Sequence, residues 1–229
     1  MKKISLISTV AIVLTCTGLF YFAADGGKVK QEAKAKIAAT TQQNKSSKLT
    51  EIKTVGMHAD FSKSYNSVKE LKNDSDIIVL GTVVDVQYFD FNTNTFTKSK
   101  VQVEKSFNGK VKKGDYVNVI EIGGLTTKGN LQKYDPEKIN IPENELNDTV
   151  KVILDGAPLT VKGDKVVVFA KEDTENFFQL NEKAYIILNS YQGKFNIDYT
   201  NNKIKRHHEN GEEDQLDLTL TNFEKQVTE

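Results

Sequence analysis

The sequence predicts a mainly β protein: a small antiparallel β-barrel of the OB type with short flanking helices, preceded by an N-terminal transmembrane helix. Three observations lead to this fold class. Short segments rich in β-branched residues recur, turn residues separate them, and strands do not alternate with long helical segments. Short strands lose their exposed edges when the sheet closes on itself, which favours a barrel over a sandwich.

The first 24 residues predict a membrane segment. Two lysines follow Met1, and the run Ile4–Ala24 carries no charge. As a helix this run measures about 30 Å, enough to cross a bilayer core. Tyr21 and Phe22 stand where a cleavage site needs small residues, and both suit a membrane interface. We expect an uncleaved signal anchor at residues 1–24 with the domain outside the cytoplasm; cleavage near Ala24, giving a secreted protein, is the alternative.

The only cysteine, Cys16, lies inside this apolar run, so the domain that follows can form no internal disulfide. Lipid attachment at Cys16 is a second alternative. It requires a small residue before the cysteine and a polar segment after it, whereas Thr15 precedes Cys16 and an apolar segment follows. Plain anchoring is therefore favoured over a lipid anchor.

Residues 25–60 predict a flexible linker, because they are rich in Lys, Ala, Gln, Ser and Thr and show no apolar face. Residues 61–229 then form the predicted barrel domain. A short helix is expected within Ser64–Asp76, capped by Asn66 or Ser67. A last helix is expected near the C-terminus, where Thr221 and Glu224 have the spacing of a capping box.

Strands are predicted from two kinds of pattern. Asp76–Phe91 is apolar at nearly every position, as in a strand buried on both faces, and Gly81 allows it to bend. Phe96–Phe107 alternates and returns as the second strand. Later strands are expected at Tyr116–Gly124, Lys165–Glu172, Lys183–Ser190 and Lys194–Thr200. The segment of about 125–159 is polar and is predicted to be an insertion with one short strand at Thr149–Leu154.

Two similar stretches, VKKGDYVNV and VKGDKVVVF, each place a Lys-Gly-Asp sequence before a valine-rich segment. Glycine permits a positive φ, and Lys and Asp suit an exposed turn. Phosphate cradles need spaced glycines before Lys-Ser/Thr and a helix, which are missing here. Both stretches, around Gly114 and Gly163, are therefore interpreted as turns that lead into strands.

Several stretches carry a resemblance: NDSDIIVLGTVVDV, SKVQVEKSFNGKVKKGDYVNVIEIGG, GAPLTVKGDKVVVFAKE, YQGKFNI and LTLTNFEKQV. In this order they resemble a group of exported or membrane-anchored, mostly uncharacterised proteins of Gram-positive bacteria, over Tyr65–Val227 with Leu125–Thr149 unmatched. The resemblance implies a shared architecture and carries over no chemistry. The strand order is also similar to the OB-type domain of tissue inhibitors of metalloproteinases and netrin-like modules. Those inhibitors bind the protease zinc through an N-terminal cysteine, which this domain lacks, so only the fold is implied.

The histidines are the first candidates for a metal site. His207 and His208 are adjacent, and neighbours on an extended chain point to opposite sides, so they do not readily bind one ion together. His58 would join them only through a contact that the sequence does not reveal. We expect a solvated loop and no metal site.

Other chemical patterns are also weak. Asp90–Thr95 imitates the start of a calcium loop, but Thr95 stands where glycine is needed, so a hairpin tip is the better interpretation. Glu121, Asp155 and Asp164 could meet in a cleft, although scattered acids are expected on a chain that is 27% charged. No nucleophile motif is present. We therefore predict no catalytic, cofactor-binding or metal-binding residues.

Charge argues against nucleic acid as a partner. Lys plus Arg equals Asp plus Glu at 31 each, and the aromatic run Tyr88–Phe91 includes an acid, so these rings are expected to fill the barrel or its rim. The predicted function is non-catalytic binding of a protein or envelope component by a membrane-anchored extracytoplasmic domain. An envelope-acting hydrolase or metal-dependent enzyme is the alternative, and an OB-type nucleic-acid-binding module is the second alternative.

Overall fold

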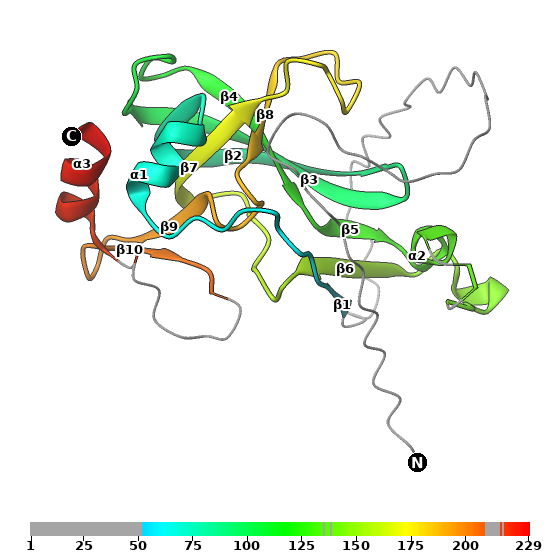
Figure 1. Ribbon diagram of the computed structural model, residues 1–229. Coiled ribbons are helices and arrows are strands. Elements are labelled where there is room, and N and C mark those ends of the chain that lie inside the picture. Colours follow the sequence, from blue (N-terminus) through cyan, green and yellow to red (C-terminus); the bar gives the residue numbers. More distant parts are fainter. Residues whose placement is uncertain (1–51, 135, 138, 209–215, 217) are drawn as a thin grey trace.

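A computed structural model describes residues 52–134, 136–137, 139–208, 216 and 218–229 (Figure 1). This part of the chain is mainly β with short helices, as predicted. The strands are β1 (Lys53–Met57), β2 (Ile77–Phe91), β3 (Asn94–Ser106), β4 (Tyr116–Ile122), β5 (Gly124–Thr127), β6 (Thr149–Leu154), β7 (Lys165–Glu172), β8 (Ala184–Ile187), β9 (Lys194–Asp198), β10 (Lys203–Arg206) and β11 (Leu218–Thr219). The helices are α1 (Val68–Asp74), α2 (Lys128–Tyr134), the 3₁₀ turn η1 (Glu143–Glu145) and α3 (Leu220–Thr228).

Five strands form a ring. Their order is β7-β2-β3-β4-β8, and β8 pairs back to β7. The β4–β8 pair is parallel, and the other pairs of the ring are antiparallel. Closing the sheet removes strand edges that would otherwise stay unpaired. The interior is filled by small branched side chains, among them Ile77, Val79, Val83, Val101, Val103, Val119, Val166, Val168 and Ile187.

The long strand β2 bends, as the sequence predicted. The register between β2 and β3 shifts between Leu80 and Gly81 and again between Val83 and Asp85. A Cβ added at Gly81 would lie 2.3 Å from the Gln102 carbonyl oxygen, so β3 approaches closer here than any other residue would allow. Beyond the bend the strands continue to a two-residue turn at Asn92 and Thr93, with φ of 47° and 67°. The prediction of a hairpin tip is confirmed.

The two Lys-Gly-Asp stretches are strand-entry turns with the same geometry. Gly114 and Gly163 have φ of 93° and 98°. In the first turn the Asp115 carboxylate accepts a hydrogen bond from the Lys112 backbone at 2.8 Å, and in the second Asp164 accepts from Val161 at 2.8 Å. Each aspartate therefore stabilises its own turn, and this interpretation of the repeat is confirmed.

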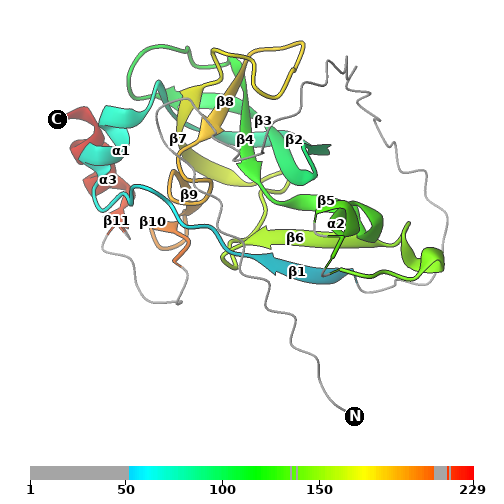
Figure 2. The ribbon, with the colours of Figure 1, turned by 45° about the vertical axis from the view of Figure 1, so that its right-hand side comes forward.

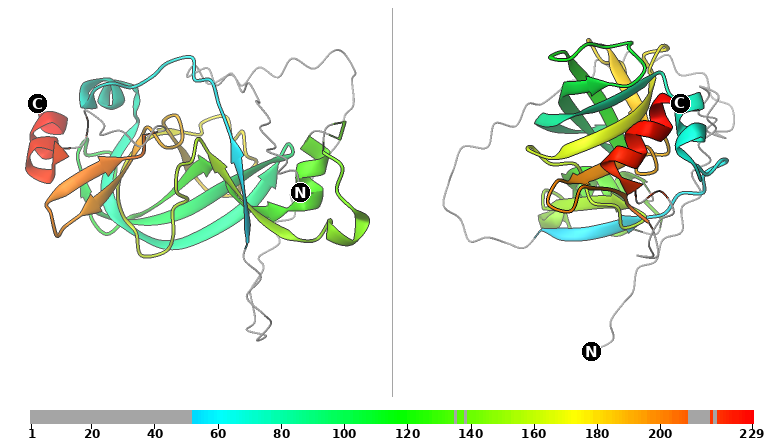
Figure 3. Two further views of the ribbon diagram at one scale, coloured as in Figure 1. Left: turned by 90° about the horizontal axis from the view of Figure 1, so that it is seen from below. Right: turned by 90° about the vertical axis from the view of Figure 1, so that its left-hand side faces the viewer.

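Helices α1 and α3 lie side by side against one outer face of the sheet (Figure 3). That face includes β9 and β10, which extend the sheet beyond β7. Ser67 caps α1 by accepting from the Glu70 backbone N–H, as expected. Helix α3 begins earlier than the predicted capping box indicated: Thr219 is its N-cap and accepts from the Asn222 N–H. The side chains between helices and sheet are Tyr65, Val68, Leu71, Ile78, Leu80, Val167, Phe169, Leu188, Phe195, Ile204, Leu216, Phe223 and Val227.

A second sheet of three strands, β1-β6-β5, lies beside the barrel (Figure 2). Strand β6 is the one predicted in the insertion, whereas β5 and α2 were not predicted. Strand β1 occupies residues 53–57, at the end of the range expected to be linker, and pairs in parallel with β6. Strand β1 is only slightly buried: Val55 and Met57 are half-buried, and its other residues are exposed. Such a strand needs few apolar residues, so its sequence shows little of the periodicity from which a strand is predicted.

The expected anchor, residues 1–24, and the linker up to residue 51 lie outside the described residues. Within the described ranges, the structure has no helix that is both long and apolar enough to cross a membrane.

Candidate functional site

The three acids that the sequence marked have separate partners. Asp164 is bound in its turn, Asp155 contacts His58, and Glu121 contacts Lys194. In the described residues no group of three or more His, Cys, Asp or Glu side chains is placed to hold a metal ion. The structure therefore does not bring these acids together, and each is understood through its own neighbours.

Glu121 on β4 and Lys194 on β9 form a buried ion pair, with both side chains 5% exposed. The Lys194 ammonium also donates to the Pro158 carbonyl at 3.1 Å and to Thr160 Oγ1 at 3.0 Å, so each of its three hydrogens has an acceptor. The other Glu121 oxygen accepts from the Thr160 N–H at 2.9 Å. Burial, with the Glu121 charge as a second cause, raises the pKa of Tyr88. Through Pro158 and Thr160, the Glu121–Lys194 ion pair ties the loop after β6 to the barrel.

Asp155 joins three segments at the end of β6. Its side chain is 4% exposed, and Oδ1 lies 3.0 Å from Nδ1 of His58, whose side chain is 51% exposed. Its carbonyl oxygen lies 2.8 Å from Nε2 of His207, and its N–H donates to the Met57 carbonyl. The fold thus brings His58 and His207 to one residue. His207 also packs edge-on against Tyr191, with ring centroids 5.3 Å apart.

His208, the neighbour of His207, does not join this group. Its Nδ1 atom is buried without a hydrogen-bond partner in the described part of the chain. The two adjacent histidines therefore have different surroundings, and both are partly buried, whereas the sequence led us to expect a solvated loop here.

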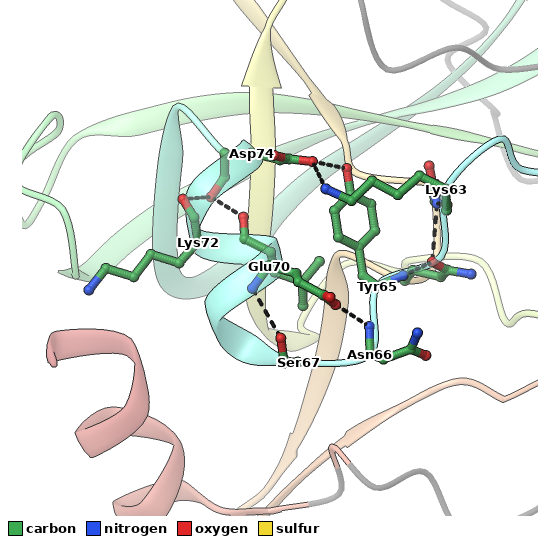
Figure 4. Close-up of polar contacts among 11 residues, drawn as sticks. Lys63, Tyr65, Asn66, Ser67, Glu70, Lys72 and Asp74 are labelled. Atoms are coloured by element: carbon green, nitrogen blue, oxygen red, sulfur yellow. Dashed lines mark hydrogen bonds and ion pairs between the residues drawn. The ribbon is translucent and has the colours of Figure 1, made fainter.

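A group of polar contacts around α1 fixes the chain that leads into β2 (Figure 4). Asp74 Oδ2 accepts from the Tyr65 hydroxyl at 2.9 Å and from the Lys63 ammonium at 2.6 Å. The hydrogen bond from Lys63 is the main cause that lowers the pKa of Asp74. The Lys63 carbonyl in turn accepts from Asn189 Nδ2 at 2.6 Å. These contacts hold α1 and the β8–β9 loop together.

That loop contains two consecutive residues, Asn189 and Ser190, with φ of 43° and 56°. Such backbone is costly for residues other than glycine, and it often marks functional sites. Here the side chains have structural partners: Asn189 contacts Lys63, and Ser190 Oγ accepts from the Ile122 N–H at 2.9 Å. The strain is therefore offset by contacts that position the ends of β4 and β8.

An aromatic cluster covers the second outer face of the barrel. On β3, Val101 and Val103 face the interior, so Phe96 faces outward, and its β2 partner Phe89 does the same. Phe91 lies on this side too, one pair closer to the hairpin tip. We name these three phenylalanines the aromatic face. All three side chains are partly exposed.

The loop between β7 and β8, residues 173–183, lies over the aromatic face, and we name it the strap. Its Phe178 is 3% exposed and packs against all three phenylalanines, with ring centroids at 4.9–5.7 Å. Phe177 packs edge-on against Phe91 at 5.2 Å. In Figure 1 the strap and the β2–β3 hairpin extend beyond the barrel toward the same side.

The polar contacts of the strap lie within the loop and at its two ends. Asp173 and Asn176 accept from backbone N–H groups within it, those of Phe177 and Leu180, both at 2.9 Å. At its C-terminal end the strap is tied to the barrel by the ion pair of Glu182 with Lys98 on β3 and by that of Lys183 with Glu172 on β7 at 2.8 Å. The Asn118 side chain on β4 also donates to the Lys183 carbonyl at 3.1 Å. The Lys98 side chain is 10% exposed and that of Glu182 is 48% exposed.

Sequence reasoning expected the aromatics of Tyr88–Phe91 to fill the barrel or its rim. Tyr88 faces inward, opposite Thr97, whereas Phe89 and Phe91 face outward under the strap. Nothing in the sequence analysis predicted a role for Phe177 and Phe178. Their signal was two adjacent aromatics in an otherwise polar loop.

No family model matches the sequence, and neither curated proteins nor solved structures provide a match.

Proposed function

We propose that the protein is a non-catalytic binding module with an OB-like barrel, anchored in the membrane of a Gram-positive bacterium and acting outside the cytoplasm. The strand order supports the OB assignment. A ring of five strands in the order β2-β3-β4-β8-β7, with only β4 and β8 parallel, is the order of the five-stranded OB barrel. The anchor rests on the apolar run Ile4–Ala24 after two lysines.

The observation that carries the binding function is the aromatic face with its strap. Six large apolar side chains cluster there while remaining partly exposed: Phe89, Phe91, Phe96, Phe177, Leu180 and Ile186. Apolar patches of this kind on a soluble domain mark interaction sites more often than isolated exposed residues do. The partner is a protein or an envelope component, and nucleic acid is not expected, because the chain carries no net charge and an acid, Asp90, stands between Phe89 and Phe91.

Photo-cross-linking in intact cells tests the proposal. A photoreactive phenylalanine analogue replaces Phe91 on the aromatic face, and in a matched variant it replaces Tyr199, which is 55% exposed on the β9–β10 turn. The expected result is a defined adduct from position 91 that position 199 does not give. Equal adducts from both positions, or none from position 91 at normal expression, would remove the support for this surface.

The contact of His58 with Asp155 favours the enzyme alternative. A buried carboxylate that orients an imidazole is a frequent arrangement in acid–base catalysis. The test is turnover of isolated envelope material by the purified protein and by Asp155→Asn. An activity lost in the variant, with the melting temperature unchanged, would establish catalysis and contradict the binding proposal.

A further inference from the structure

The strap occupies the aromatic face as a bound ligand would. Phe178 lies at the centre of the cluster, and the strap reaches this position as a loop without strand pairing between Asp173 and Ala184. Asn176 and Gln179, on either side of Phe177 and Phe178, have φ of 49° and 54°. Such values are unfavourable for residues other than glycine, and they bend the loop so that Phe178 points at the barrel.

Lys98 shows what any occupant of this face must supply. Its ammonium lies on the outer side of β3, beside Phe96, and its side chain is nearly buried. Glu182 of the strap is its carboxylate partner. A buried ammonium that loses its counter-charge is costly, so an occupant that replaces the strap must bring a carboxylate to Lys98 as well as an aromatic ring to the phenylalanines.

We infer that the strap is a built-in pseudo-ligand, and that the partner is a peptide segment presenting an aromatic residue and a carboxylate four residues later, as Phe178 and Glu182 do. This inference rests on the proposed binding function and names the partner class and its regulation. The partner displaces Phe178 from the aromatic face and takes over the ion pair with Lys98. Because the strap is part of the same chain, its high effective concentration keeps the face closed to weak ligands.

The test uses a labelled peptide of residues 173–183 as the probe and fluorescence anisotropy as the readout. Full-length protein in detergent is compared as wild type, Phe178→Ala and Phe178→Ala/Lys98→Met. Phe178→Ala leaves the aromatic face vacant, so the peptide is expected to bind about tenfold or more tightly than it binds wild type. The double variant is expected to lose that gain. A peptide that carries alanine at its own position 178 serves as the control and should bind none of the proteins.

Equal binding to wild type and to a folded Phe178→Ala variant would overturn the inference. Should Phe178→Ala unfold, Glu182→Gln replaces it, because this change removes only the ion pair with Lys98 and should still raise peptide affinity about threefold. No gain in that variant would likewise overturn the inference. The peptide experiment uses purified protein, so its failure can be told apart from failure of the cross-linking experiment. If the peptide binds as expected but position 91 gives no adduct in cells, the proposed binding function is rejected and the pseudo-ligand is kept. If position 91 gives an adduct but the peptide shows no gain in affinity, only the pseudo-ligand is rejected.

Discussion

The two outer faces of the barrel are covered in different ways. On one face, α1 and α3 bury Phe169, Phe195 and Phe223, each 0% exposed. On the other, a loop without strand pairing covers Phe89, Phe91 and Phe96 and leaves them partly exposed. Both faces use edge-to-face phenylalanines, so the side chains are alike and the cover differs.

The difference between the two covers suggests different roles for the two faces. On the first face both helices have capped N-termini, and the phenylalanines beneath them are completely buried. This face is therefore packed as tightly as a protein core. The strap is fixed by local turns and, at its C-terminal end, by the ion pairs of Glu182 with Lys98 and of Lys183 with Glu172. Because it has no strand pairing of its own, we expect the second face to open at a lower cost than unfolding of the domain. We therefore assign stability to the helix-covered face, and the proposed binding function to the strap-covered face.

The largest expected effect contrasts one phenylalanine from each face. Phe223→Ala should lower the free energy of unfolding by about 4 kcal/mol, because a fully buried ring leaves a cavity that the helices cannot fill. Phe178→Ala should cost about 2 kcal/mol, since this ring packs beneath a loop and against rings that are themselves partly exposed. Equilibrium urea unfolding measures both. Equal losses would contradict the distinction between the faces.

Gly81 lies where β2 leaves the helix-covered part of the sheet and bends toward the hairpin. Gly81→Ala should destabilise the protein by about 3 kcal/mol, because its Cβ would lie 2.3 Å from a backbone oxygen of β3 that cannot move aside. Gly56→Ala on β1 is the matched control, as nothing lies within 4 Å of the added carbon, and it should change stability by about 0.5 kcal/mol or less. Thermal unfolding of both variants decides the point.

Acid should weaken the helix-covered side through Asp76, which follows α1. Its carboxylate accepts from the Glu172 N–H at 3.0 Å, and this bond is the main cause that lowers the pKa of Asp76 from its ordinary 3.8. A lowered pKa means that its contribution is present above about pH 4 and is lost as the pH falls further. The melting temperature of Asp76→Asn should therefore lie below wild type at pH 6 and approach it at pH 3. Asp60→Asn, at an exposed position, is the control for loss of a carboxylate as such, and its melting temperature at pH 6 should stay close to that of wild type.

The smallest effect concerns the hairpin that carries the aromatic face. Thr93 has φ of 67° in its tip, which is unfavourable for a β-branched residue. Thr93→Gly should raise stability by about 0.5 kcal/mol, measured as a higher melting temperature. Asn92→Gly should gain less, because asparagine tolerates this backbone better. A loss in Thr93→Gly larger than in Asn92→Gly would show that the turn is not strained.

Local patterns made much of the fold predictable. Three correctly predicted features depend only on residues that are neighbours in the sequence. They are the alternation of Val101 and Val103, the bend at Gly81 and the two Lys-Gly-Asp turns. The pairing of β1 with β6 joins segments about a hundred residues apart, and the contact of Glu121 with Lys194 depends on the same kind of long-range approach. No local period encodes such contacts.

The aromatic face was missed for a more specific reason. The extra residue in β2 between Val83 and Asp85 exchanges the inner and outer sides of the strand. Before it, Ile77, Val79 and Val83 face inward; after it, Val86 does so, and Phe89 and Phe91 turn outward. A one-residue shift moves every later side chain to the other face, and nothing in the sequence marks where it happens.

Native-state hydrogen exchange tests most directly whether the two covers differ in stability. We expect the Phe177 and Leu180 amides of the strap to exchange by local opening, at a rate that low urea concentrations leave unchanged. The Phe169 amide, bonded to the Gly193 carbonyl at 2.8 Å under the helices, should exchange only with global unfolding and accelerate with urea. The same opening free energy and the same urea dependence at both positions would contradict this expectation.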